Sequence, residues 1–282
     1  MRYKECMKNT RRTRLLALDV DGTLLTDDYQ ITAATRAAVQ QVTSHGVQVV
    51  LASARGPGAL RSITRELGIA GLAICYTGAL TCRLDADAHV PTEVVTEQRM
   101  SLSSAHIALS NALELGISVG WFSGDCWYIP EWDSTLHHES IITGVIPIVA
   151  PDLIHFEEAP HKLQAIVEEP ALLPRLYTLA RTLPPDCAGQ FSYATYLEIT
   201  HQGVDKAKAL LTLGEQLGIA PSEMVAIGDR ENDVAMLRLA ALGIAMGNAP
   251  SAVQAEADWV TETNNRDGVA VAIERLQANG WI

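Results

Sequence analysis

The feature that most limits the fold is an alternation of short apolar strands with helices, which occurs at both ends of the chain. Near the start, predicted strands at 14–19, 47–52 and 72–76 alternate with helices at 32–45 and 58–67. Near the end, helices at 206–217, 232–239, 249–256 and 268–277 alternate with strands at 224–227, 242–245 and 259–261. Strands that are apolar on both faces and are separated by helices are typical of a parallel sheet covered on both sides. The sequence therefore predicts one α/β domain with a doubly wound, Rossmann-like parallel sheet, built from both ends of the chain.

The middle of the chain has a different character. Between residues 83 and 195 aromatic residues cluster, prolines are frequent, and short strands are predicted at 118–121, 126–129 and 162–167. We expect an inserted α+β domain over 83–195, while 1–82 and 196–282 form the core and a strand at 196–199 follows the insertion. Trp121, Trp127 and Trp132 are expected to build the small core of that insertion rather than a binding site.

Charge and composition limit the partners of this protein. The net charge is −12, and a basic start with +5 in the first 14 residues leaves −17 for the remainder. Such an acidic body repels nucleic acid and anionic lipid, and no apolar run reaches the ~20 residues of a membrane helix. The five scattered cysteines lack CxxC spacing, which favours reduced thiols. We expect a cytoplasmic protein that binds neither nucleic acid nor membrane, with its oligomeric state left open.

Two aspartates end the first predicted strand, which is otherwise apolar. Asp19 lies on the strand, and Asp21 lies on the turn that Gly22 permits. Taken alone, this pair is equally well explained as a polar turn in which Asp21 caps backbone amides. Because burying an ionised carboxylate costs several kcal/mol unless it is compensated, the pair also indicates a positively charged partner.

Polar residues follow other predicted strands as well. Ser53 and Arg55 come after the second strand and before a helix, where an anion is favoured. Asp229 and Asp233 lie four residues apart where the strand 224–227 leads into a helix, and capping is again the alternative explanation. In a parallel sheet the carboxyl ends of the strands line the ligand site, so these residues are expected to meet.

Four carboxylates at the ends of two strands of one sheet would repel one another unless a divalent ion lay among them. Hard oxygen ligands that leave room for water and a phosphate are typical of Mg²⁺. The sequence therefore predicts Mg²⁺ as the cofactor, with Asp19, Asp21, Asp229 and Asp233 at the metal site.

Taken together, these motifs resemble the haloacid dehalogenase superfamily over residues 14–82 and 200–282. The motifs are Asp19-Val-Asp-Gly-Thr23, Ser53, Lys206 and Gly228-Asp-Arg-Glu-Asn-Asp233. Three further segments are similar to the Cof-type phosphatases, which carry a large inserted cap: 203–206 (GVDK), 245–249 (AMGNA) and 263–269 (TNNRDGV).

The resemblance implies a role for each matching residue. Asp19 would be the nucleophile that forms an aspartyl-phosphate, and Asp21 the general acid and base. Ser53 and Lys206 would hold the phosphoryl oxygens. The metal would be held by Asp19, the main-chain carbonyl of Asp21 and Asp229, with Asp233 behind them.

This chain departs from the family pattern near the expected substrate. Thr77 precedes Gly78 where relatives carry Asn, Ala54 replaces a glycine, and Ala207 replaces another. We expect Thr77, Gly78, Asn232 and above all Arg55 to contact substrate, because the planar guanidinium of Arg55 suits a second anionic group. His137, His138 and Glu139 are expected to form a solvated face rather than a metal site, since adjacent side chains diverge.

These expectations combine into one leading function. The chain is predicted to be a Mg²⁺-dependent phosphatase of a small phosphorylated metabolite, a sugar phosphate or a phosphorylated cofactor, with the cap closing over it. A phosphomannomutase-like phosphotransferase and a non-catalytic phosphometabolite sensor are the alternatives that the sequence leaves open.

Overall fold

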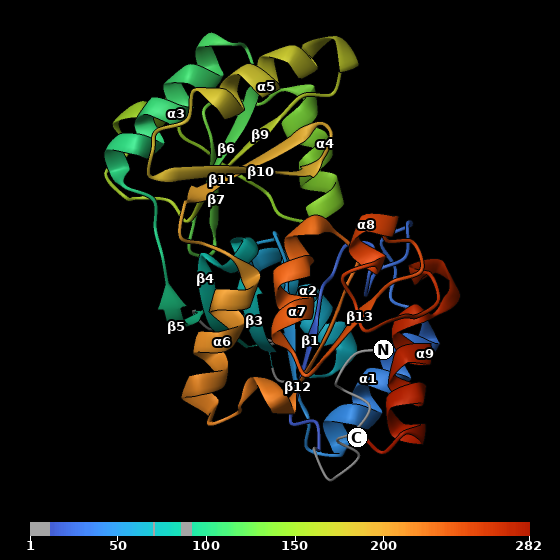
Figure 1. The fold of residues 1–282 in the computed structure, drawn as a ribbon. Coiled ribbons are helices and arrows are strands. Elements are labelled where there is room, and N and C mark those ends of the chain that lie inside the picture. The colour runs from blue at the N-terminus through green and yellow to red at the C-terminus, as the bar shows by residue number, and fades with distance from the viewer. Residues whose placement is uncertain (1–11, 70, 86–91) are drawn as a thin grey trace.

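The computed structural model describes residues 12–69, 71–85 and 92–282, which form two lobes, each built on one β-sheet (Figure 1). The core lobe contains the elements before Gln98 and after Asp205, and the second lobe contains the elements between them. Most of the basic start of the chain, and Cys6 within it, lie outside the described residues.

The core sheet has eight strands in the order β14-β13-β12-β1-β2-β3-β4-β5. The first six strands in this order pair in parallel. They are β14 (Trp259–Val260), β13 (Leu242–Ala245), β12 (Met224–Gly228), β1 (Leu15–Leu18), β2 (Gln48–Ala52) and β3 (Gly71–Cys75). The chain proceeds from β1 toward β3 on one side and from β12 toward β14 on the other, so the order of the strands reverses at β1. A ligand site is expected at this switch point.

Helices cover both faces of the core sheet because alternate residues of each strand point to opposite faces. Leu16 and Leu18 pack with α1 (Ala33–Ser44), α2 (Pro57–Leu67) and α9 (Gly268–Ala278). Leu15 and Ala17 pack with α6 (Lys206–Leu217), α7 (Val234–Leu239) and α8 (Ser251–Gln254) on the other face. The predicted doubly wound α/β core is confirmed.

Two antiparallel strands extend this sheet beyond what the sequence predicted. They are β4 (Leu80–Leu84) and β5 (Glu93–Glu97). As a result the core sheet continues to Glu97, whereas the predicted insertion began at residue 83. The antiparallel return was missed because the pattern of helix followed by parallel strand stops at Cys75, and a hairpin needs no helix.

The second lobe is an α+β unit. Its sheet has the order β10-β11-β9-β6-β7-β8, with β10 (Cys187–Tyr193), β11 (Tyr196–His201), β9 (Lys162–Ile166), β6 (Ser118–Ser123), β7 (Cys126–Ile129) and β8 (Ile148–Val149). One face packs against α3 (Leu102–Glu114) and α5 (Leu173–Arg181), and the other lies beside α4 (Ser134–Thr143). Strand β11 pairs within this sheet, so the second lobe extends past the predicted boundary at 195.

The tryptophans of the second lobe have two different environments. Trp121 and Trp127 are buried in its apolar clusters, as expected. Trp132 is 45% exposed, so its assignment to that core was wrong. It follows strand β7 in a loop that ends at the N-cap Asp133, outside the packed sheet.

Two chain segments, after β5 and after β11, join the lobes, and side-chain contacts hold them together (Figure 1). Arg61 on α2 pairs with Asp125 at 2.9 Å, and the hydroxyl of Tyr76 donates to the carbonyl of Gly124 at 2.9 Å. Both contacts involve the turn between β6 and β7. The second lobe therefore lies over the end of the core sheet where β2 and β3 terminate.

A tight turn after β3 brings α6 close to the core sheet. Thr77 and Gly78 both have positive φ, 58° and 113°. A Cβ atom on Gly78 would lie 2.5 Å from the carbonyl oxygen of Asp205, the residue before Lys206. Close backbone approach at Gly78 therefore fixes where α6 begins.

We predict that Gly78→Ala lowers the free energy of unfolding by about 1–3 kcal/mol more than Gly218→Ala does. Gly218 is a matched control because it also has a positive φ, +63°, but a Cβ there would meet nothing within 4 Å. Urea unfolding followed by circular dichroism measures both variants. If both variants lose the same free energy of unfolding, the close approach of residue 78 to Asp205 does not affect stability.

Candidate active site

Strand pairing brings the sequence-predicted residues together at one edge of the core sheet. The amide of Asp19 donates to the carbonyl of Ile227 at 3.0 Å, which extends the pairing of β1 with β12 by one residue. Asp19 thus lies beside the end of β12, and Asp229 is the residue that follows this strand. Ser53 follows β2 on the other side of β1.

Three buried carboxylates meet here. Asp19, Asp229 and Asp233 each offer an oxygen, and these oxygens all lie within 4.8 Å of one another. Lys206, at the start of α6, inserts its ammonium between two of them, 2.6 Å from Asp19 Oδ1 and 2.7 Å from Asp233 Oδ1. The side chain of Lys206 is only 1% exposed, so its charge belongs to this cluster rather than to the surface.

Asp233 holds other groups of the cluster in position. Its Oδ1 accepts from Lys206, and its Oδ2 accepts from the amides of Asp229 and Arg230, both at 3.0 Å. With both oxygens used in this way, Asp233 orients the lysine and the turn that carries Asp229. Among the four aspartates predicted at the metal site, it is therefore the one suited to a supporting position.

The turn after β1 packs tightly on Asp229. Thr23 donates through Oγ1 to Asp229 Oδ1 at 3.1 Å, and Asn248 donates to the carbonyl of Gly22 at 2.8 Å. Gly22 has a φ of +84°, and a Cβ there would lie 2.5 Å from Asp229 Oδ2. Only glycine fits this turn, which explains the Asp-Gly-Thr order in the sequence.

The charges of the cluster are not balanced by the protein alone. Burial, followed by the neighbouring Asp233, raises the pKa of Asp19 well above its usual value and raises that of Asp229 to about 6. Burial opposes the charge of Lys206, but Asp19 and Asp233 outweigh that effect and raise its pKa. Three carboxylates face the ammonium of Lys206 and, 3.7 Å from Asp229, the guanidinium of Arg230, so one negative charge remains and the site accommodates added positive charge.

The donor set fits a hard divalent cation. Carboxylate oxygens from Asp19 and Asp229 are close enough to share one ion, and Asp233 stands behind them. Oxygen-only ligands are those that Mg²⁺ prefers, and the absence of histidine and cysteine from this cluster disfavours softer transition metals.

Asp21 and Arg55 form an ion pair at the mouth of the site. Arg55 donates from Nε to Asp21 Oδ2 at 2.8 Å and from Nη2 to Asp21 Oδ1 at 2.6 Å. This bidentate geometry uses the planar fork of the guanidinium. Arg55 was expected to contact substrate; in this structure its fork is taken by Asp21, although both residues line the cavity.

The remaining predicted residues divide into two groups. Ser53 and Asn232 line the cavity, and the buried Oδ1 of Asn232 has no hydrogen-bond partner within the described part of the chain. Thr77 and Gly78 are not among the lining residues. Instead, the amide of Thr77 donates to the carbonyl of Ser53 at 2.9 Å, so this turn supports the serine loop from behind.

The cavity between the lobes has a volume of about 240 Å³. Besides the core-lobe residues, several polar side chains that the sequence did not predict line this cavity. These side chains are Asp125, Glu139, Lys162, Gln164, Ser192, Tyr193, Tyr196 and Glu198. Lys162 donates to the carbonyl of Ala54 at 3.0 Å, directly linking β9 to the serine loop.

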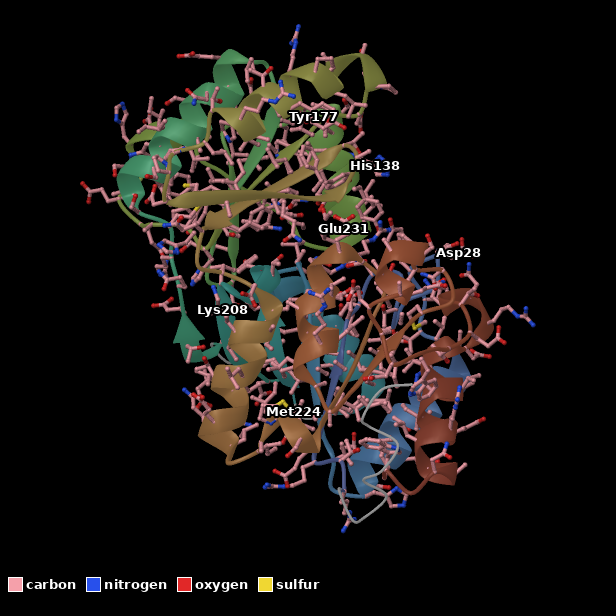
Figure 2. All side chains as sticks on the ribbon, viewed as in Figure 1. Asp28, His138, Tyr177, Lys208, Met224 and Glu231 are labelled. Carbon is pink, nitrogen blue, oxygen red and sulfur yellow. The ribbon has the colours of Figure 1, made fainter. Side chains whose placement is uncertain are left out.

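The expectation of a solvated face at residues 137–139 was wrong for Glu139. His137 and His138 are exposed, as Figure 2 illustrates for His138 at the edge of the lobe, but Glu139 is buried at 7% exposure and faces the cavity. Helix geometry explains the difference, because consecutive residues of α4 point about 100° apart. Alternation in Lys162-Leu-Gln164 and in Leu197-Glu198-Ile199 was the available signal for the other missed residues.

Comparison with known proteins gives a consistent result. A model of the haloacid dehalogenase-like hydrolases matches residues 16–273. The Bacillus subtilis protein YxeH is 30% identical over 93% of this chain and 98% of its own length. The 5-amino-6-(5-phospho-D-ribitylamino)uracil phosphatase YcsE of the same organism is 28% identical over 92% of this chain and 94% of its own.

A solved structure agrees in fold. A haloacid dehalogenase-like hydrolase from Bacteroides thetaiotaomicron superimposes with a TM-score of 0.84 and 26% identity, covering 94% of this chain and all of that one. In the described residues of the present chain, no helix combines the length and apolar character needed to cross a membrane.

We predict that Mg²⁺ raises the thermal midpoint more at about pH 7.5 than at about pH 5. Folding raises the pKa of Asp229 from 3.8 to about 6, so within that window the metal-free folded protein retains a proton that the unfolded chain has released. The stability of the metal-free protein therefore falls as pH rises through this window. Above the window Asp229 is ionised in the folded protein, so Mg²⁺ binds without displacing a proton.

Thermal melts in EDTA and in Mg²⁺ at both pH values measure this effect. Asp229→Asn should lose most of it, whereas Asp28→Asn, at an exposed position labelled in Figure 2, should keep it. An equal Mg²⁺ response in wild type and Asp229→Asn would contradict the assignment of Asp229 as a ligand.

Proposed function

The chain belongs to the haloacid dehalogenase-like hydrolases and is a phosphoric monoester hydrolase, and from this premise we propose that it is a Mg²⁺-dependent phosphatase acting through an aspartyl-phosphate on Asp19. The observation that carries the proposal is the position of Asp19: buried, bonded to Lys206, within shared-ion distance of Asp229, and exposed to the cavity on one side. The substrate class is a small phosphorylated metabolite, a sugar phosphate or a phosphorylated cofactor. YcsE, whose name specifies such a substrate, supports this choice.

Asp19 is the proposed nucleophile. One of its carboxylate oxygens attacks phosphorus, the bond from phosphorus to the leaving oxygen breaks, and the phosphoryl group is transferred to Asp19. Lys206 already lies 2.6 Å from Asp19 Oδ1, so its charge offsets the repulsion between this carboxylate and the phosphate. Ser53, at the end of β2, faces the same space and would hold a phosphoryl oxygen.

Mg²⁺ would be held by Asp19, Asp229 and the main-chain carbonyl of Asp21, with Asp233 orienting the turn that carries Asp229. When bound, it supplies positive charge that lets the anionic nucleophile and the anionic phosphate approach each other. Asp233 contributes by keeping both Lys206 and the Asp229 amide in place.

Asp21 is the proposed general acid and base. It gives a proton to the departing alkoxide, then accepts a proton from the water that attacks the aspartyl-phosphate, which releases phosphate and restores Asp19. Both oxygens of Asp21 accept one bond each from Arg55 in this structure, and each oxygen keeps a second lone pair that can carry the proton. Arg55 would therefore hold the carboxyl group in position during proton transfer.

We propose that the second lobe acts as a cap, the role expected for the insertion predicted at 83–195. Its residues form one wall of the cavity, and contacts such as Lys162 with Ala54 close it over the serine loop. Closure would exclude bulk water while the aspartyl-phosphate forms. We propose that a substrate enclosed in this way is a small molecule, and the expectations of a cytoplasmic location and of no nucleic-acid or membrane partner stay predictions.

We predict that Asp19→Asn lowers Mg²⁺-dependent hydrolysis of p-nitrophenyl phosphate by about 10³-fold or more, because the amide cannot attack phosphorus. The exposed Asp28→Asn variant should retain wild-type activity. Phosphate release measures both rates. Equal residual rates in wild type and Asp19→Asn would favour a phosphometabolite sensor, and failure of ¹⁸O from labelled water to appear in released phosphate would favour phosphotransfer.

A second prediction concerns the leaving group. Asp21→Asn should slow alkyl phosphates by about 10²–10⁴-fold, but slow p-nitrophenyl phosphate much less in the aspartyl-phosphate-forming step, because nitrophenolate leaves without a proton. Single-turnover kinetics with an alkyl and a nitrophenyl ester separate this step from hydrolysis of the intermediate. A uniform loss across both esters would contradict the acid role of Asp21.

A further inference from the structure

The second lobe places two buried carboxylates on the cavity wall opposite Asp19. Glu139 lies on α4 at 7% exposure, and Glu198 lies on β11 at 5% exposure. Both line the cavity, as does Gln164 on β9. Since the transferred phosphate belongs beside Asp19, this far wall faces the part of the substrate that leaves.

Hydrogen bonding makes this wall rich in acceptors. Glu139 accepts from Gln164 Nε2 at 3.3 Å and from the hydroxyl of Tyr196 at 3.0 Å, one donor on each oxygen. A carboxylate has about four acceptor positions, so Glu139 can accept further bonds. Glu198 Oε2 lies 2.7 Å from Lys162 Nζ, yet it is buried and accepts no well-aligned hydrogen bond.

The positive groups near this wall are already engaged. Lys162 donates to Gln164 Oε1 at 3.2 Å and to the carbonyl of Ala54 at 3.0 Å, and it forms an ion pair with Glu198. Its positive charge is therefore already compensated by a carboxylate of this wall. The fork of Arg55 is bonded to Asp21, and Arg230 lies over the ring of Tyr193 and 3.7 Å from Asp229, at the phosphate end.

Apolar groups complete the pocket. Phe122, Trp127, Ile142 and Val145 also line it, and they suit the carbon skeleton of a bound molecule. A ligand that contacts both carboxylates must donate hydrogen bonds to them from its own hydroxyl or amino groups. A second anionic group would meet two carboxylates and no uncommitted cation on this wall.

We propose that the leaving group accepted by this cavity carries hydroxyl or amino hydrogen-bond donors and no second negative charge, and that Glu139 is the residue that enforces this selectivity. The inference rests on the proposed phosphatase function and adds to it a substrate class and a specificity-determining residue. It also replaces the expectation that Arg55 recognises a second anion, because that guanidinium is paired with Asp21.

Two phosphate esters that differ only at the far end provide the test. Sorbitol 6-phosphate ends in a hydroxymethyl group, and 6-phosphogluconate ends in a carboxylate on the same six-carbon chain. Wild type with Mg²⁺ should show a kcat/KM for sorbitol 6-phosphate at least about tenfold higher, because like charges in a closed cavity repel. A second pair, glucosamine 6-phosphate and glucose 6-phosphate, distinguishes an amine from a hydroxyl as the preferred donor.

Glu139→Gln keeps the shape of the side chain and removes its charge. It should reduce the sorbitol-to-gluconate ratio by about tenfold, mainly by improving 6-phosphogluconate. The control is Glu131→Gln, an exposed glutamate of the same lobe, which should keep the wild-type ratio. Thermal melts establish that each variant is folded.

The possible failures are distinguishable. Equal or better use of 6-phosphogluconate by wild type would overturn the inference while leaving the phosphatase function intact, and an unchanged ratio in folded Glu139→Gln would overturn the role of Glu139. If no ester is hydrolysed, including p-nitrophenyl phosphate, the proposed function fails. Thermal stabilisation by sorbitol 6-phosphate compared with 6-phosphogluconate then decides the selectivity on its own.

Discussion

The structure depends on the confinement of like charges at the end of two parallel strands. Asp19 and Asp229 are adjacent because β1 and β12 pair in register, and Asp233 is brought in by the turn that follows β12. All three carboxylates are buried, so water screens their mutual repulsion only weakly. Lys206 offsets part of the repulsion, and burial, together with the remaining repulsion from Asp233, raises the pKa of Asp19 and of Asp229. A site that keeps an excess of negative charge favours a bound cation. Such a cation would in turn supply positive charge next to a phosphoryl group.

The fold meets this constraint through close backbone approaches rather than through long side chains. Gly22 brings the turn after β1 against Asp229, and Gly78 brings the turn after β3 against Asp205, just before Lys206. The two approaches, made by turns of the N-terminal part of the chain, position a carboxylate and an ammonium of the C-terminal part, Asp229 and Lys206. Because both depend on positive φ and on the lack of a Cβ atom, the geometry is fixed by the backbone and tolerates little change.

Sequence reasoning succeeded where a residue follows a strand of predictable type. The positions of Asp19, Ser53 and Asp229 at one edge of the sheet follow from strand and helix periodicity, together with the rule that ligands bind at the carboxyl ends of parallel strands. It failed for the second lobe, where side chains such as Glu139 and Glu198 reach the cavity from elements whose relative placement depends on tertiary packing. The His137-His138-Glu139 run illustrates the limit, because the sequence gives no indication of which side of α4 faces the cavity. The ion pair between Asp21 and Arg55 was also invisible, since 34 residues separate its members.

The two halves of the cavity have complementary chemistry, and Lys162 connects them. On the core side, positive charge and metal ligands suit the phosphoryl group, while on the far side acceptors suit a neutral or amino-bearing leaving group. Lys162 reaches from β9 to the carbonyl of Ala54, between Ser53 and Arg55, and at the same time pairs with Glu198. Loss of Lys162 would therefore disturb both the serine loop, through Ala54, and the acceptor wall, through Glu198. Under the proposed function, recognition of the leaving group and positioning of the phosphoryl group would both involve this one buried ammonium.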